Sequence, residues 1–538
     1  MSTPTPARTR SFWAWGFEDK LPDAAARGAL AEQVGAVLGV TCSPRALPAF
    51  DPSCVPAPRV APSGEVTHFA DAAPFARAMH AYGKSYRDVV RAFRLDFAAA
   101  PDLVLTPRDD DDVARALAWA EREKVCVVPY GGGTSVVGGV ECPLPAGSRG
   151  VASLDMRAMD RVLEIDPVSR AALVQAGATG PVLEEQLAAH GLTLRHFPQS
   201  FELSTLGGWL ATRAGGHYAT LLTHIDDMVE SIRMVTPRGV WESRRLPASG
   251  AGPSPDRLAL GSEGILGVIT QAWMRVVPRP RWRASVSVYY ATFAEGAEAC
   301  RAIAQAGLYP SNCRLLDARE ALLHGVPSDG KNVLLLGFES ADHELPPWMD
   351  RALALAKAAG GECPNAPVYA DEGATARANA TATSWRQAFF DAPYLQSALV
   401  TLGVLADTFE TACTWDRFPA LHKEVKRAVI EALKKECGGG VVTCRFTHVY
   451  PDGPAPYYTF VGRAEEGREL EQWAVIKKAA GDALSACGAT ITHHHAVGRT
   501  HRPWYDKERP DPFAAALRGA KFAVDPMAVL NPGALVDV

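Results

Sequence analysis

The feature that most constrains the fold of this chain is a run of three consecutive glycines within Pro129–Ser135. The apolar segment Val125–Val128 precedes it and predicts a short buried strand. Glycine has no Cβ, so the run permits positive φ angles and lets a ligand approach the backbone closely. Successive free N–H groups in such a turn bind anions, and Thr134 and Ser135 add hydroxyl donors. The loop therefore predicts a binding site for a phosphate or pyrophosphate.

An ordinary turn between two strands is the alternative explanation for this loop. The loop sequence matches neither the GxxxxGK[ST] pattern of P-loops nor a GxGxxG pattern that opens a Rossmann helix. Two further stretches favour a ligand site. His196–Gly216 is dense in glycine and hydroxyl groups, and Gly261–Thr270 is a glycine-punctuated turn into an apolar strand. Because strands and helices alternate around all three loops, we expect a nucleotide-binding domain of the α/β or α+β class.

Length, charge and cysteine spacing exclude several other classes of protein. A chain of 538 residues predicts two or more domains, and the net charge of −5 gives no reason to expect nucleic acid as a partner. The 11 cysteines include no CxxC pair, which favours reduced thiols over a zinc site or a disulfide framework. The sequence shows neither a secretory signal nor an apolar run of transmembrane length. We expect a soluble cytoplasmic protein.

Capping and alternation patterns predict further elements. The aspartate run Asp109–Asp112 marks the start of a helix that we expect to continue through Ala120. Carboxylates at a helix N-terminus meet the positive end of the helix dipole, so the run needs no metal to explain it. Alternating apolar residues in Arg283–Phe293 predict a strand, and helices are expected at Ala294–Ala306 and Met349–Gly360.

Sequence motifs along the whole chain resemble one known family. PYGGGTSVVGG at 129–139, the PQS to GG stretch at 198–216 and GSEGILGVIT at 261–270 resemble the flavin-binding domain of vanillyl-alcohol-oxidase-type FAD proteins. Within that superfamily the chain is most similar to the alkylglycerone-phosphate (alkyl-dihydroxyacetone-phosphate) synthase family. The similarity continues through CRLLD at 313–317, DTFETACTWDR at 407–417, TCRFTHVY at 443–450, THHHAVG at 492–498 and DPMAVLNPG at 525–533.

The resemblance implies an α+β fold in which a two-subdomain FAD-binding domain carries an α/β cap domain that covers the flavin and forms the substrate pocket. We expect a helical N-terminal region at 1–96, the FAD-binding domain at 97–280, the cap domain at 281–484 and a C-terminal segment at 485–538 that returns to the flavin.

The same resemblance implies that the three loops hold FAD. Members that bind FAD covalently often carry a histidine directly after the glycines, where this chain has Thr134, so we expect non-covalent FAD. The residues expected to contact FAD are Pro129, Tyr130, Gly131, Gly132, Gly133, Thr134, Ser135, Gln199, Ser200, Ser204, Thr205, Gly208, Thr212, Arg213, Ala214, Gly215, Glu263, Gly264, Ile265, Leu266, Gly267, Val268 and Ile269.

Three single residues align with catalytic positions of the family. Tyr457 aligns with the catalytic tyrosine, a candidate general acid or base, and its neighbour Tyr458 would face the opposite side of a strand. His196 aligns with an active-site histidine, and Arg314 with an arginine that is important for activity, through the organisation of the flavin site. The alternatives are a packing role for the tyrosine, a capping or loop role for the histidine and a surface salt bridge for the arginine.

Three consecutive histidines, His493, His494 and His495, form the most conspicuous cluster of titratable residues. On an extended chain, consecutive side chains point to alternate faces, so we do not expect all three to chelate one metal, and we predict no metal site. A solvated run is one alternative. The family instead implies that one or two of the imidazoles line the cavity between flavin and substrate as proton carriers or donors.

One position departs from the family pattern. Gln396 stands where the family carries an arginine that binds the substrate phosphate. Glutamine is a neutral donor, whereas arginine offers a charged bidentate fork, so loss of the arginine could cost about 1.5–3 kcal/mol of substrate affinity. This position therefore predicts a substrate without the phosphate, or a phosphate bound by another cation, for which Arg386 and Arg445 are the candidates.

The family implies an ether-lipid reaction without net redox change. The acyl chain of an acyl-dihydroxyacetone-phosphate is replaced by a fatty alcohol, through an adduct at flavin N5. Two alternatives stay open: an FAD-linked dehydrogenase or oxidase of a 2-hydroxy acid or alcohol, and a flavin-binding protein with a decayed active site. The expected partners are a small-molecule or lipid-like substrate, a second copy of the chain in a homodimer and at most a peripheral membrane contact, with no nucleic acid.

Overall fold

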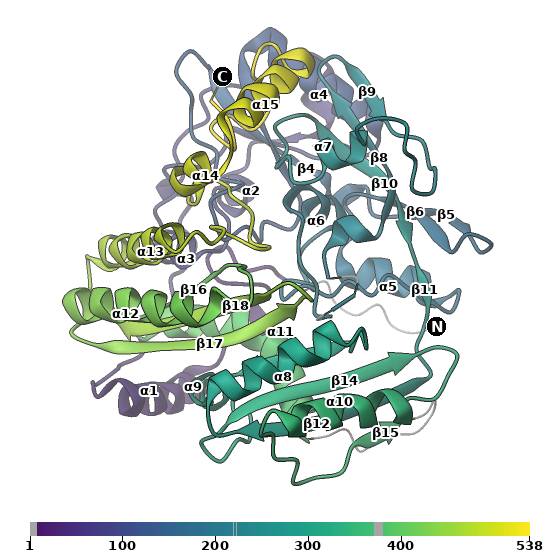
Figure 1. The fold of residues 1–538 in the computed structure, drawn as a ribbon. Helices are drawn as coiled ribbons and strands as arrows, with labels where there is room; N and C mark the ends of the chain where they lie inside the picture. The colour runs from purple at the N-terminus through teal and green to yellow at the C-terminus, as the bar shows by residue number, and fades with distance from the viewer. Residues whose placement is uncertain (1–7, 219, 222, 371–379, 538) are drawn as a thin grey trace, which may run out of the picture.

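Sheets of four, five and seven strands, a separate two-stranded pair and the helices packed on them form the described part of the protein (Figure 1). The computed structural model describes residues 8–218, 220–221, 223–370 and 380–537. The first two sheets lie in the upper half of Figure 1, and the third and largest sheet lies in the lower half. None of the helices within the described residues is both long enough and apolar enough to cross a bilayer.

The first sheet has four strands, and the glycine loop follows one of them. Its elements are β1 (Ala70–Asp71), β2 (Leu103–Leu105), α4 (Asp110–Glu123), β3 (Val125–Tyr130) and β4 (Gly150–Asp155). The order is β1-β2-β4-β3, and all pairs are parallel except the one with the edge strand β1. Asp109 caps α4 by accepting a hydrogen bond from the backbone of Asp112, so the expected helix start is confirmed.

The second sheet has five antiparallel strands in the order β5-β6-β10-β8-β9. Two short helices, α5 and α6, pack with this sheet around a shared apolar core. Strands β7 and β11 form a separate antiparallel pair, and β11 is the last strand before the chain enters the third sheet. The elements are β5 (Val162–Asp166), β6 (Ala171–Gln175), α5 (Gly180–Ala188), β7 (Leu192–Thr193), α6 (Leu206–Thr212), β8 (Val229–Thr236), β9 (Gly239–Glu242), α7 (Pro255–Ala259), β10 (Val268–Arg275) and β11 (Val277–Pro278).

The third sheet has seven antiparallel strands in the order β15-β12-β14-β13-β17-β18-β16. The chain enters it at β12, where the expected strand is confirmed, and the two expected helices are α8 and α10. Its elements are β12 (Trp282–Tyr290), α8 (Phe293–Gln305), β13 (Asn312–Leu316), α9 (Ala318–Leu323), β14 (Asn332–Ser340), α10 (Pro346–Ala358), β15 (Val368–Ala370), α11 (Ala380–Thr401), β16 (Val404–Glu410), α12 (Phe418–Cys437), β17 (Gly440–Val449), β18 (Pro454–Arg463) and α13 (Glu469–Ala486).

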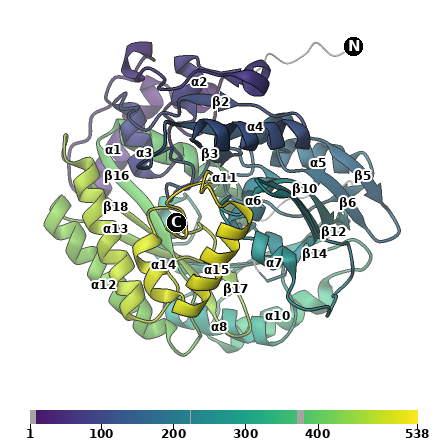
Figure 2. The same cartoon turned by 90° about the horizontal axis from the view of Figure 1, so that it is seen from above.

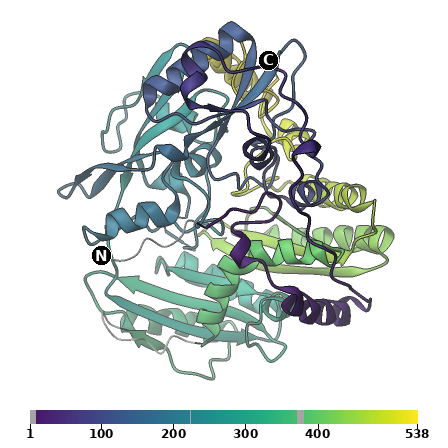
Figure 3. The ribbon, with the colours of Figure 1, turned by 180° about the vertical axis from the view of Figure 1, so that it is seen from behind.

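The two faces of the seven-stranded sheet have different neighbours. Helices α8, α10 and α12 cover one face, and their apolar side chains pack against apolar side chains of the strands. Helices α9 and α11 lie on the other face, which is also the face that borders the cavity described below. Figure 3 shows α11 lying across the sheet from behind. Tyr457 and Tyr458 follow this division, since Tyr457 lines the cavity and Tyr458 is buried in the core on the helical face.

The segments at the two ends of the chain lie beside different sheets, and the first helix packs against α11 and the third sheet. The elements are α1 (Ala24–Leu38), α2 (Pro74–Met79) and α3 (Tyr86–Phe93) near the start, and α14 (Arg502–Glu508) and α15 (Asp511–Val524) near the end. Figure 2 shows α14 and α15 lying over the middle of the molecule. After α15 the backbone of Val529 and Asn531 forms hydrogen bonds with Val127 of β3. The expected domain boundaries at 96, 280 and 484 stay a prediction.

Candidate active site

A cavity of about 270 Å³ lies between the glycine-rich loops and the seven-stranded sheet. A second cavity of about 100 Å³ adjoins it, because both are lined by Gly131, Ser135, Thr205, Gly208 and Thr212. Of the other expected FAD residues, Gly132, Gly133, Thr134, Gln199, Ser200, Ser204, Ala214 and Gly215 line the larger cavity. Pro129, Tyr130, Glu263, Gly264, Gly267, Val268 and Ile269 line the smaller one.

The remaining three expected FAD residues line neither of these cavities. Arg213 pairs with Asp226 at 3.0 Å, and its side chain is largely exposed. Ile265 and Leu266 are buried in the apolar core beneath the second sheet. The two motifs that contain these residues therefore border the cavities, but the three side chains themselves point away from them.

The glycines allow the first two loops to touch. A Cβ built on Gly131 would lie 2.2 Å from the Thr205 hydroxyl oxygen, and one built on Gly132 would lie 2.1 Å from the Leu203 carbonyl oxygen. Only glycine permits this approach, which leaves backbone and hydroxyl donors around one hollow. This arrangement fits a flavin dinucleotide, whose pyrophosphate needs donors and whose ring needs an apolar wall.

Tyr457 projects into the larger cavity from β18, the strand next to the edge strand β16. It pairs with Arg445 of β17 on one side and with Glu410 of β16 on the other. Its hydroxyl donates a hydrogen bond of 2.9 Å to Thr408 Oγ1, and the Arg445 guanidinium lies 3.9 Å from its ring centre. Burial raises the pKa of Tyr457, although the nearby Arg445 opposes that shift. The phenol is thus fixed, neutral and directed at the substrate space.

The three histidines form a tight loop around one carboxylate. The backbone N–H groups of His493, His494 and His495 all donate to Glu410, at 2.6, 3.1 and 3.0 Å. Burial alone would raise the pKa of Glu410, but His494 and His495 beside it hold that pKa well below its usual range. Our expectation of an extended chain with alternating side chains is therefore wrong. The rings of His494 and His495 both line the larger cavity.

Arg314 is fully buried, so a surface salt bridge is not its role. It lines the larger cavity and donates to His217 Nδ1 at 3.2 Å and to the carbonyl oxygen of Thr447 at 3.4 Å. Burial, together with the charge of Arg445, lowers the pKa of Arg314 to about 9. A cation held in this way organises one wall of the cavity.

His196 is buried behind the cavity and is not one of the residues that line it. Its ring packs against Trp209 with the two ring centres 5.0 Å apart. Neither ring nitrogen has a hydrogen-bond partner among the described residues. Burial lowers the pKa of His196 to about 3, so the ring is neutral at pH 7. His196 therefore does not line the cavity into which Tyr457, His494 and His495 project.

Gln396 lines the larger cavity but is held by other protein groups. Its side-chain oxygen accepts a hydrogen bond of 2.7 Å from the indole nitrogen of Trp15, and its nitrogen donates to the Ala406 carbonyl oxygen at 3.3 Å. Of the two candidate cations, Arg445 lines the cavity and forms an ion pair with Glu320. The side chain of Arg386 lies outside those that the structure describes.

Sequence reasoning missed several residues at or beside these cavities, among them Trp15, His448, Asn531 and Glu410. Trp15 and His448 line the larger cavity, Asn531 lines the smaller one, and Glu410 holds the histidine loop. The sequence features that could have indicated these residues were the tryptophan-rich start of the chain and the polar residues inside otherwise apolar strands. Each residue reaches its place through contacts with distant parts of the chain, which no local pattern records.

Comparisons with known proteins agree with this site. Residues 101–243 match the family described as FAD binding domain, and residues 279–535 match that of FAD linked oxidases, C-terminal domain. The alkyldihydroxyacetonephosphate synthase of Dictyostelium discoideum is 32% identical over 487 residues, which cover 86% of this chain and 77% of the relative. A glycolate oxidase subunit of Bacillus subtilis is 26% identical over 448 residues, 81% of this chain and 89% of the relative.

A solved structure of an alkyldihydroxyacetonephosphate synthase has the same fold, with a TM-score of 0.78 at 25% identity over 97% of this chain and 98% of that chain. The expected α+β fold, with an FAD-binding domain of the vanillyl-alcohol-oxidase type, is thereby confirmed. FAD is the cofactor, and the protein is an FAD-dependent enzyme. The chain belongs to the alkyldihydroxyacetonephosphate synthase family.

Proposed function

We propose that the protein replaces the acyl chain of an acyl-dihydroxyacetone-phosphate-like substrate with a fatty alcohol, without net oxidation. The bond between the substrate carbon and the acyl oxygen breaks, and the fatty acid leaves as its carboxylate. The alcohol oxygen takes its place and releases its proton. The observation that carries the proposal is that Tyr457, Arg314 and the histidine loop border the same cavity as the glycine-rich loops.

Tyr457 acts as the general acid or base at the substrate carbon. Its hydroxyl is fixed by Thr408 and lies in a cavity that is also lined by His494 and His495. Arg314 keeps its positive charge on the cavity wall, where it favours an anionic substrate or product. When bound, FAD supplies the covalent chemistry of the exchange, and the residues around it position the substrate and exclude water.

The glycine-rich loops hold FAD without a covalent bond. Thr134, which stands where covalent members often carry a histidine, lines the cavity with a hydroxyl group that forms no stable bond to a flavin. A lipid-like substrate is consistent with the apolar residues of the cavity wall, such as Leu323, Phe389 and Leu399. Homodimer formation, peripheral membrane contact and a cytoplasmic location remain predictions.

The experiment that tests the exchange is an anaerobic incubation of the FAD-loaded protein with acyl-dihydroxyacetone phosphate and a fatty alcohol. We expect an ether product and one free fatty acid per turnover, while the flavin spectrum at the end is that of the oxidised cofactor. Product without an added electron acceptor supports the exchange. The incubation is repeated with acyl-dihydroxyacetone, which lacks the phosphate. The proposal is overturned if neither substrate gives an ether product.

An FAD-linked dehydrogenase of a 2-hydroxy acid is the second candidate, and the similarity to a glycolate oxidase subunit favours it. In that case a hydroxy acid bleaches the flavin anaerobically, because the hydride stays on the cofactor until an acceptor is added. The same incubation with glycolate and lactate therefore separates the two candidates. A protein that binds FAD but responds to none of these compounds would support a decayed active site.

A further inference from the structure

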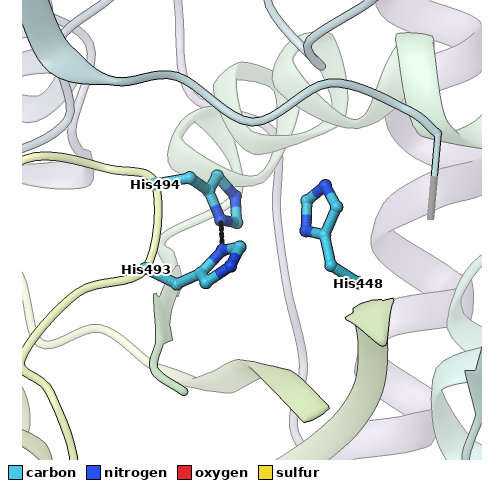
Figure 4. A group of neighbouring side chains, drawn as sticks. All are labelled: His448, His493 and His494. Atoms are coloured by element: carbon cyan, nitrogen blue, oxygen red, sulfur yellow. Dashed lines mark hydrogen bonds between the residues drawn. The ribbon is translucent and has the colours of Figure 1, made fainter. Parts of the chain in front are cut away.

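Three imidazoles from two distant parts of the chain converge at the wall of the larger cavity. His448 lies one residue before the end of β17, and His493 and His494 belong to the loop before α14. One ring nitrogen from each lies within 4.8 Å of the others. Figure 4 shows the three rings turned toward one another. His448 plays no part in the proposed exchange, so its presence here needs a separate explanation.

The protonation of His448 follows from its surroundings. Its Nε2 lies 2.9 Å from the Gly216 carbonyl oxygen, and because a carbonyl only accepts, Nε2 carries the proton. Nδ1 therefore carries a lone pair. His448 is 1% exposed, and Nδ1 has no hydrogen-bond partner among the described residues. A buried acceptor without a partner is costly, which points to a ligand at this place.

His493 and His494 present a second pair of nitrogens. Their Nδ1 atoms are 3.0 Å apart. That distance fits a shared proton, and it also fits two ligands of one ion, since metal–nitrogen bonds of about 2.0–2.1 Å place neighbouring ligand nitrogens roughly 3 Å apart. On the other side of its ring, His493 Nε2 lies 2.9 Å from the Tyr450 hydroxyl. Such an outer partner fixes the orientation of a ligating imidazole.

One buried carboxylate lies beside this cluster, opposite the positive charges of Arg314 and Arg445 on the cavity wall. The Glu410 carboxylate is 1% exposed and lies 3.6 Å from His494 Nδ1. Its hydrogen bonds to the backbone of the loop keep both histidines in place. His448 and His494 also line the larger cavity, so a fourth coordination position faces the substrate space.

We propose that His448, His493 and His494 bind one divalent transition-metal ion on the wall of the substrate cavity. Three neutral imidazoles select ions such as Zn²⁺, Co²⁺ or Ni²⁺ and discriminate against Mg²⁺ and Ca²⁺, which prefer oxygen ligands. The site adjoins the second glycine-rich stretch, because His448 donates a hydrogen bond to the Gly216 carbonyl oxygen. It does not depend on which reaction the enzyme performs.

The test uses untagged, FAD-loaded protein that has been dialysed against a chelator and then brought to equilibrium with Zn²⁺. We expect one tightly bound Zn²⁺ per chain by elemental analysis, a rise in the unfolding temperature with Zn²⁺, and no such effect of Mg²⁺. His448→Gln, whose amide can still donate to Gly216, and His494→Gln should each weaken Zn²⁺ binding by at least about tenfold. Flavin content and circular dichroism show which variants are folded.

His343→Gln is the matched control, because His343 is a partly exposed histidine that pairs with Asp342 on the third sheet's side of the molecule. It should bind Zn²⁺ as the wild type does. The proposal is overturned if the wild type binds no Zn²⁺, or if folded His448→Gln binds one equivalent as tightly as the wild type. A loss of binding in His343→Gln alone would equally contradict it. If His494→Gln loses its flavin, His448→Gln decides the outcome.

Discussion

The indole nitrogen of Trp15 donates a hydrogen bond of 2.7 Å to the side-chain oxygen of Gln396, although 381 positions separate them in the sequence. The amide nitrogen of Gln396 donates in turn to Ala406, and Asp407 Oδ1 lies 3.5 Å from it. Glutamine can fill this position because its amide accepts and donates at once. An arginine could only donate.

Gln396→Arg alone should therefore fail to create a phosphate site. Trp15 would lose its acceptor, and the new guanidinium would be attracted to the Asp407 carboxylate on the cavity wall instead of to a substrate phosphate. We expect no decrease in the KM for acyl-dihydroxyacetone phosphate and a lower unfolding temperature, since an orphaned buried donor costs about 1–3 kcal/mol.

The double variant Trp15→Phe/Gln396→Arg removes the orphaned donor and is the matched comparison. We expect it to be more stable than Gln396→Arg alone. If the single variant instead binds the phosphorylated substrate at least tenfold better at unchanged stability, Gln396 is a simple specificity switch and Trp15 is irrelevant to it.

Tyr457→Phe should lower turnover by about 10²–10⁴-fold, because the phenol is the proposed acid or base. Its flavin content should stay near that of the wild type, since the hydroxyl contacts Thr408 and none of the glycine-rich loops. The measurement is the turnover number per bound flavin. Tyr458→Phe is the control on the opposite face of the same strand. Equal losses of turnover in both variants would indicate a packing role.

Gly132→Ala should abolish flavin binding. Its new Cβ would lie 2.1 Å from the Leu203 carbonyl oxygen, which forces the first two loops apart. The measurement is flavin absorbance per protein, and Gly250→Ala, where a Cβ meets nothing within 4 Å, is the control. Acid precipitation of the wild type should release intact FAD into solution. Flavin that stays with the precipitated chain would show a covalent link.

Local sequence patterns were sufficient to predict those parts of the fold that depend on interactions between residues close together in the chain. The glycine loop, the aspartate-capped helix α4 and the opposite orientations of Tyr457 and Tyr458 depend on residues close together in the chain. Capping, steric freedom and strand alternation therefore predict them.

His448 shows why the rest of the site could not be predicted. Strand alternation places Arg445 and Thr447 on the cavity face, so His448 should face away. The register of β17 and β18 shifts between Phe446 and His448, and this bulge leaves both Thr447 and His448 on the cavity face. A bulge of this kind depends on the partner strand. The contact between Glu410 and the histidine loop likewise depends on tertiary packing.

His196→Phe tests whether His196 is structural or catalytic. Burial lowers the pKa of the folded histidine to about 3, whereas the unfolded one titrates near 6.5. The folded state therefore binds fewer protons between these values, and its stability falls as the pH drops below about 6.5. At about pH 5 this histidine alone should destabilise the wild type by about 2 kcal/mol relative to pH 7.

Phenylalanine keeps an aromatic ring against Trp209 and cannot be protonated. We therefore expect the unfolding temperature of His196→Phe to fall less between about pH 7 and pH 5 than that of the wild type, with turnover at pH 7 within a few-fold of normal. His190→Gln, at an exposed histidine, controls for the mere loss of an imidazole. A drop in turnover of about 10²-fold or more at full flavin content would make His196 part of the catalytic machinery despite its place behind the cavity.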